Sequence, residues 1–225
     1  AAEEVEVGGD FYDFYESDGW VVLLGDVTGK GVEAAALTSL VRHGARFLSR
    51  YERSPSRILA GLNAALREQG GLLLCTALCV RLHPDRAIIA SAGHPPALVA
   101  RDDGRMREIG AAGPILGAWS TAGWADQSVP IAPDETLFIY TDGVIDTPGE
   151  DGRFGLRQLK RLLREHAGKP SDRLLAELEA ALDRFQVGSQ ADDTAALALR
   201  PVAPEAAASD REEHRTSRVR TLVVS

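Results

Sequence analysis

The sequence has 225 residues, 44% of them hydrophobic and 26% charged, which is typical of a globular domain with a hydrophobic core. Its 33 acidic and 25 basic residues give a formal net charge of −8, which argues against nucleic acid or an anionic membrane surface as the main partner. No apolar run approaches the ~18 residues of a membrane span, so we expect a cytoplasmic protein without membrane segments.

The first half of the chain predicts two strands, two helices and then a run of strands. Short turns between the later strands imply antiparallel pairing. Ser54 and Pro55 have the residue types of an N-cap and a first helical position. The two cysteines are expected to be small buried residues of a reduced protein rather than a metal or redox pair. The predicted elements are strands at 11–16 and 20–24, helices at 32–51 and 55–69, and strands at 72–82, 86–92, 97–101 and 105–109.

The second half predicts strands at 127–131, 136–140 and 194–200 and helices at 154–166 and 171–186. Helices in pairs between antiparallel strands indicate an α+β fold rather than βαβ winding. We therefore expect a four-layer α-β-β-α sandwich, with two antiparallel sheets flanked by paired helices. Residues 201–225 are expected to be mostly a flexible extension, of which "TLVVS" could pair with a sheet edge.

The stretch "LLGDVTGKGVEAA" at 23–35 has the setting of a phosphate-binding loop. A Walker loop needs four residues between its first glycine and its Gly-Lys pair, followed by Ser or Thr. Here Gly25 and Gly29 have three residues between them, and Gly31 follows Lys30. Such loops also belong to parallel sheets. The spacing and the scaffold both argue against a nucleotide site.

Aspartates stand at the ends of several predicted strands. Asp26 and Asp142 each end an apolar run, Asp10 begins the first strand, and Asp192 and Asp193 precede the last one. Each alone is typical of a plain turn. Carboxylates that are brought together repel, and such a group suits a hard divalent cation, Mg²⁺ or Mn²⁺. Zinc is not favoured, because no Cys/His set has ligand spacing.

Five motifs then occur in a fixed order, and His94 of the third is expected to be structural rather than a ligand. Over residues 3–200 they resemble those of PPM-type (protein phosphatase 2C-like) serine/threonine phosphatases, and most closely the SpoIIE/RsbU branch. The motifs are EVGGDFYDF, LLGDVTGKGVEAAAL, ASAGHPPALVAR, FIYTDGVID and QADDTAALAL.

The resemblance implies a phosphatase domain over 1–200, with a first strand truncated at the N-terminus, and a 201–225 extension. It implies two Mn²⁺ or Mg²⁺ ions that activate a water to hydrolyse phosphoserine or phosphothreonine. It further implies a phosphorylated protein substrate of the anti-sigma-factor antagonist type and an upstream sensor or regulatory domain, and it is compatible with a homodimer. The implied catalytic and metal-binding residues are Asp10, Asp26, Asp142 and Asp192, with the Val27 carbonyl and with Asp193 as a substitute for Asp192.

Some features depart from the wider family or leave alternatives open. Relatives outside the branch have a histidine two residues after the second acid, where this chain has Thr28, so water or another group must protonate the leaving group. Gly29 and Gly31 are compatible with a hinge to a regulatory helix pair over 32–68, or with plain helix packing. Two other functions compete with a protein phosphatase. One is a phosphatase-like binding module without activity, and the other is a hydrolase of a different phosphoester.

Overall fold

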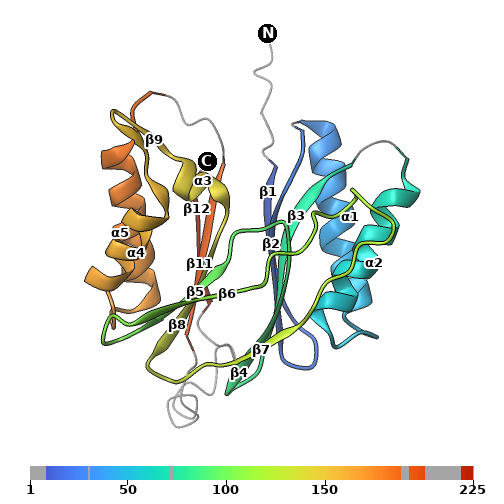
Figure 1. Ribbon diagram of the computed structural model, residues 1–225, viewed down its shortest axis with the longest axis horizontal. Helices are drawn as coiled ribbons and strands as arrows, with labels where there is room; N and C mark the ends of the chain where they lie inside the picture. The colour runs from blue at the N-terminus through green and yellow to red at the C-terminus, as the bar shows by residue number, and fades with distance from the viewer. Residues whose placement is uncertain (1–8, 30, 71–72, 189–192, 201–218, 225) are drawn as a thin grey trace, which may run out of the picture. The chain divides into compact units, whose positions relative to one another are not determined.

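The computed structural model describes residues 9–29, 31–70, 73–188, 193–200 and 219–224, which belong to two compact units. Each unit contains a five-stranded sheet and a pair of long helices (Figure 1). This confirms the predicted α+β class with antiparallel sheets and paired helices. Asp192 and residues 201–218 lie outside the described residues.

The first unit covers residues 1–83, 87–96 and 110–129. Its sheet has the strand order β1-β2-β3-β4-β7, and α1 and α2 lie side by side over one face of it (Figure 1). Ser54 caps α2 by accepting the Arg57 backbone N–H, as its position before Pro55 predicts. The bounds are β1 Asp10–Glu16, β2 Trp20–Val27, α1 Val32–Leu48, α2 Pro55–Glu68, β3 Cys75–Leu82, β4 Arg86–Ala92 and β7 Gln127–Pro130.

The apolar faces of α1 and α2 pack on alternate residues of the sheet and form the core of this unit. Leu37 and Val41 of α1 and Leu62 of α2 are buried in the same cluster as Phe11 and Leu23 of the strands. The two cysteines, Cys75 and Cys79, are buried in this core with free thiols, which confirms their prediction as core residues. Burial raises the pKa of both thiols, and that of Cys79 to about 12.

The second unit covers residues 84–86, 97–109 and 130–225. Its sheet has the strand order β12-β11-β8-β5-β6, and α4 and α5 pack on Phe138 and Tyr140 of β8. The bounds are β5 Ala97–Arg101, β6 Met106–Ile109, β8 Glu135–Tyr140, α3 Asp142–Asp146, β9 Pro148–Gly149, β10 Gly152–Arg153, α4 Gly155–Glu165, α5 Ser171–Phe185, β11 Thr194–Leu199 and β12 Val219–Val224.

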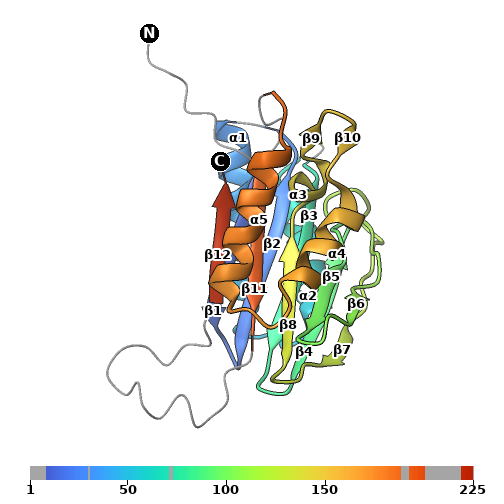
Figure 2. The same ribbon diagram turned by 90° about the vertical axis from the view of Figure 1, so that its left-hand side faces the viewer.

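Three features differ from, or add to, the sequence-based expectations. β2 continues three residues past the predicted end, because β1 and β3 pair with it on both sides as far as Asp26. The short helix α3 and the β9–β10 hairpin are too short to leave a periodic pattern in the sequence. The edge pairing that "TLVVS" could make is present: β12 pairs antiparallel with β11 (Figure 2).

Of the helices that the structure describes, none has the length and apolarity to cross a bilayer.

The buried side chain of Arg81 binds two chain connections at one end of the first unit. Arg81 in β3 is 1% exposed, and its guanidinium donates hydrogen bonds to four backbone carbonyls. Nε donates to Arg53 at 2.7 Å and Nη2 to Glu52 at 2.9 Å, both in the α1–α2 connection. Nη1 donates to Asp18 at 3.1 Å and to Ser17, in the β1–β2 turn. One side chain therefore ties two connections to the sheet.

We expect Arg81→Met to lower the free energy of unfolding by at least about 3 kcal/mol, because several carbonyls lose a buried donor. Arg81→Lys should cost less, since an ammonium group retains part of the donor set. Urea denaturation measures both effects. The control is Arg57→Met, which removes only an exposed 3.6 Å ion pair with Glu52. A loss in Arg81→Met no larger than in the control would contradict a fastening role.

Candidate metal centre

The first unit places two of the predicted acids directly opposite each other. Asp10 of β1 is the register partner of Asp26 of β2, and both side chains are partly exposed. Phe11 and Asp13 are buried on the alternate positions of β1, so the two acids occupy the sheet face opposite α1 and α2. Directly opposite side chains have Cβ atoms about 4.5–5.5 Å apart, and like charges in such pairs destabilise a sheet. A cation would offset that repulsion.

The backbone at Gly9 comes close to oxygens of Asp26 and Val27, which the family resemblance implies as metal ligands. A Cβ atom at Gly9 would lie 2.2 Å from Asp26 Oδ1 and 2.5 Å from the Val27 carbonyl oxygen. The Val27 N–H donates to the Gly9 carbonyl at 3.1 Å, which holds the two segments together. No side chain fits at this position. A carboxylate oxygen and a carbonyl oxygen therefore converge beside Asp10, and oxygen ligands of this kind suit Mg²⁺ or Mn²⁺.

The second unit brings together another pair of acidic positions. Asp142 begins α3 directly after β8, and Asp193 precedes β11. Thr141 joins the two strand ends: its N–H donates to the Ala195 carbonyl at 2.9 Å, and its Oγ1 accepts the Ala195 N–H at 2.9 Å. A Cβ atom at Gly143 would lie 2.0 Å from the Asp193 carbonyl oxygen. The first turn of α3 therefore lies against the backbone of Asp193.

The predicted site residues thus occur as pairs, with one pair in each unit. Asp192, the preferred fourth acid, lies outside the described residues. Within the part of the chain that the structure describes, no three His, Cys, Asp or Glu side chains form a group that could hold a metal. The four-acid set therefore stays a prediction.

Thr28 stands where relatives outside the branch carry a histidine, and the structure gives its hydroxyl a local role. Thr28 Oγ1 donates to the Leu74 carbonyl at 3.2 Å, and the Thr28 N–H donates to the same oxygen at 3.0 Å. Both bonds continue the β2–β3 ladder beyond Val27. Thr28 is thus a tie between strands.

Sequence reasoning did not predict the contacts of Thr76, and it interpreted His94 as structural. Thr76 is the register partner of Asp26, and its Oγ1 accepts the Asp26 N–H at 3.1 Å. The same oxygen lies 3.3 Å from His94 Nδ1. The available signal was a single hydroxyl in the apolar run "LLLCTALCV". Its contact with His94, 18 positions away, leaves no local pattern.

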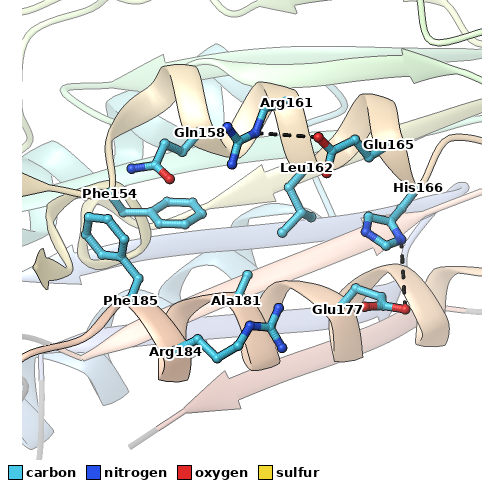
Figure 3. Close-up of a pocket in the computed structure, with 10 residues that line it drawn as sticks. All are labelled: Phe154, Gln158, Arg161, Leu162, Glu165, His166, Glu177, Ala181, Arg184 and Phe185. Carbon is cyan, nitrogen blue, oxygen red and sulfur yellow. Dashed lines mark ion pairs between the residues drawn. The ribbon is translucent and has the colours of Figure 1, made fainter.

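A groove of about 250 Å³ lies between α4 and α5 of the second unit (Figure 3). Phe154 and Phe185 meet edge to face in it, with ring centroids 5.3 Å apart. Its two glutamates already have partners. Glu165 contacts Arg161 at 3.5 Å, and Glu177 contacts a lysine at 3.5 Å and a histidine at 3.9 Å. This groove lacks the paired aspartates of a metal site.

Comparison with known proteins assigns the chain to a family. Residues 16–202 match the model of Stage II sporulation protein E (SpoIIE). The chain belongs to the SpoIIE family. It is 23% identical over 200 residues to "Phosphoserine phosphatase RsbU" of Bacillus subtilis, covering 87% of this chain and 60% of that protein. The chain thus spans about three fifths of the length of this relative.

Solved structures show the same fold across both units. The SiaA-PP2C domain of Pseudomonas aeruginosa matches with a TM-score of 0.77 and 28% identity, covering 86% of this chain and 81% of that one. The RsbU and RsbW domains of Rv1364c from Mycobacterium tuberculosis match with a TM-score of 0.74 and 28% identity, covering 91% of this chain and 58% of that one. This SpoIIE family member therefore has the PP2C fold, as its five motifs predict.

We expect Gly9→Ala to raise the Mn²⁺ dissociation constant at least about tenfold, because the new methyl group must displace Asp26 Oδ1 or the Val27 carbonyl. Isothermal titration calorimetry on the full chain measures the change. Gly123→Ala is the matched control, since a Cβ atom there meets nothing within 4 Å. Equal affinities in Gly9→Ala and wild type would contradict a cation at this corner.

Proposed function

We propose that this SpoIIE family member is a Mg²⁺- or Mn²⁺-dependent protein phosphatase that hydrolyses phosphoserine or phosphothreonine. The observation that carries the proposal is the convergence of Asp26 Oδ1 and the Val27 carbonyl at Gly9, with Asp10 as the opposite acid. Family membership and the phosphoserine phosphatase name of RsbU support the same reaction. The structure of RsbX, a neighbour with the same fold at 15% identity and a TM-score of 0.58, is a complex with magnesium.

In this proposal the groups that would hold metal ions are aspartate carboxylates and one backbone carbonyl. Asp10, Asp26 and the Val27 carbonyl act in the first unit, and Asp142 acts with Asp192 or Asp193 in the second. Asp26 would supply carboxylate oxygens as metal ligands. When bound, the two ions supply Lewis-acid activation of water and compensation of the phosphoryl charge.

The chain's own residues then have two tasks. The acidic pairs would hold the ions from positions at or next to strand ends. Their negative charge also repels a phosphoryl group when no cation is present, so substrate binding depends on metal loading. The Thr28 hydroxyl donates to Leu74, so we assign leaving-group protonation to water.

The proposed substrate is a phosphorylated regulatory protein of the anti-sigma-factor antagonist type. The relative from Mycobacterium tuberculosis, whose structure contains RsbU and RsbW domains, supports a substrate of this type for the present protein. We place the reaction in the cytoplasm, under the control of an upstream sensor or regulatory domain. A homodimer is compatible with this role.

The proposal predicts that Asp26→Asn and Asp142→Asn each lower the rate of Mn²⁺-dependent release of phosphate at least about 100-fold, because each removes a charged metal ligand. The assay uses a phosphoserine protein and the full 225-residue chain. Asp103→Asn is the control, since this carboxylate pairs on the surface with Arg105.

Three outcomes of this assay decide between the candidate functions. Equal rates in wild type and both site variants would contradict the phosphatase proposal. Wild type that binds Mn²⁺ and the phosphoprotein without releasing phosphate would favour a phosphatase-like binding module. Release of phosphate from nucleotides alone would favour a different phosphoester.

A further inference from the structure

A side-chain hydrogen bond holds the backbone of Asp26 at the end of the β2–β3 ladder. The Asp26 N–H donates to Thr76 Oγ1 at 3.1 Å, and Thr76 is the directly opposite residue of β3. Asp26 is also the residue whose Oδ1 lies beside Gly9. A shift of the Asp26 amide would therefore move both the Asp26 carboxylate and the Val27 carbonyl.

The hydrogen-bond chain continues from Thr76 to His94. Thr76 Oγ1 lies 3.3 Å from His94 Nδ1. An amide can only donate, so the hydroxyl oxygen accepts from Asp26 and has its single hydrogen available for Nδ1. The His94 tautomer in which Nδ1 accepts this hydrogen carries its ring proton on Nε2.

His94, the last residue of this hydrogen-bond chain, lies in a turn whose backbone is held by hydrogen bonds. His94 is 7% exposed. The Ser91 hydroxyl donates to the His94 carbonyl at 3.1 Å, and the Gly93 N–H donates to the Gly113 carbonyl at 2.9 Å. Gly93 has φ 64°, a conformation in which a side chain would be strained. These bonds hold the backbone of the turn that carries His94.

We infer that Thr76 and His94 are positioning residues that hold Asp26 in the geometry required for cation binding. The inference rests on the proposed function, since Asp26 must be a metal ligand. It assigns a role to the histidine of the "SAGHPPAL" motif. Partners that orient metal ligands typically change metal affinity 10–100-fold when they are removed.

The first test compares Thr76→Val with Thr76→Ser on the full chain. Thr76→Val keeps the shape and removes the hydroxyl, so the Mn²⁺ dissociation constant should rise at least about tenfold. Thr76→Ser keeps the hydroxyl and should stay within about threefold of wild type. Calorimetry and the electron paramagnetic resonance spectrum of bound Mn²⁺ report on the site independently of turnover. Urea unfolding without metal shows whether each variant is folded.

Thr38→Val is the matched control, because its buried Oγ1 has no hydrogen-bond partner among the described residues. This control should bind Mn²⁺ like wild type. Thr76→Val that also binds like wild type would overturn the inference.

The second test addresses His94 in the same way. His94→Asn places an acceptor oxygen near the position of Nδ1 and should restore most of the Mn²⁺ affinity that His94→Leu loses. Since both residues act through one chain, the double variant Thr76→Val/His94→Leu should lose no more affinity than Thr76→Val alone. Fully additive losses would overturn the relay. If Thr76→Val does not fold, the Mn²⁺ affinities of His94→Leu and His94→Asn decide whether the inference holds.

The outcomes separate this inference from the phosphatase proposal. Wild type that binds Mn²⁺ and releases phosphate, together with variants of unchanged affinity, would overturn the positioning role alone. Wild type that neither binds Mn²⁺ nor releases phosphate would overturn both.

Discussion

The antiparallel pairing of β1 with β2 is the constraint on which the acidic pair of the first unit depends. The β1–β2 register puts Asp10 opposite Asp26, and neither strand can shift by one residue without turning its buried face outward. On the other face of β1, the buried Asp13 forms an ion pair with Arg46, which donates to it at 2.5 and 2.6 Å. For Asp10 and Asp26, the proposed cation comes from solution.

The long strand β3 serves stability at one end and the proposed site at the other. Arg81, near its C-terminal end, fastens the β1–β2 turn and the α1–α2 connection through backbone carbonyls. Thr76, near its N-terminal end, holds the Asp26 amide. The core residues between them are buried against α1 and α2. The same strand thus carries the arginine that binds two connections and the threonine that contacts Asp26, and regular strands hold side chains more precisely than loops do.

The sequence predicted those features that depend on local pattern. The bounds of β4 and β5, both helix pairs and the acids near strand ends all follow from periodicity and turn residues. The extension of β2 to Asp26 was missed because Gly25 interrupts the apolar run, whereas pairing on both sides carries the strand through it. The contacts of Thr76 with Asp26 and His94 were not predicted because they join residues far apart in the sequence, and no periodicity records such contacts.

The glycines beside the acids show why a turn interpretation of each motif is incomplete. In "GGD" and "TDG" the glycine alone is typical of a turn. In the structure, a Cβ atom at Gly9 would meet Val27 O at 2.5 Å, and one at Gly143 would meet Asp193 O at 2.0 Å. Each glycine therefore allows a backbone carbonyl from another segment to approach the chain next to an acid. At Gly9 a carboxylate oxygen and a carbonyl oxygen converge, and this convergence, rather than the number of acids, favours a hard cation over a simple turn there.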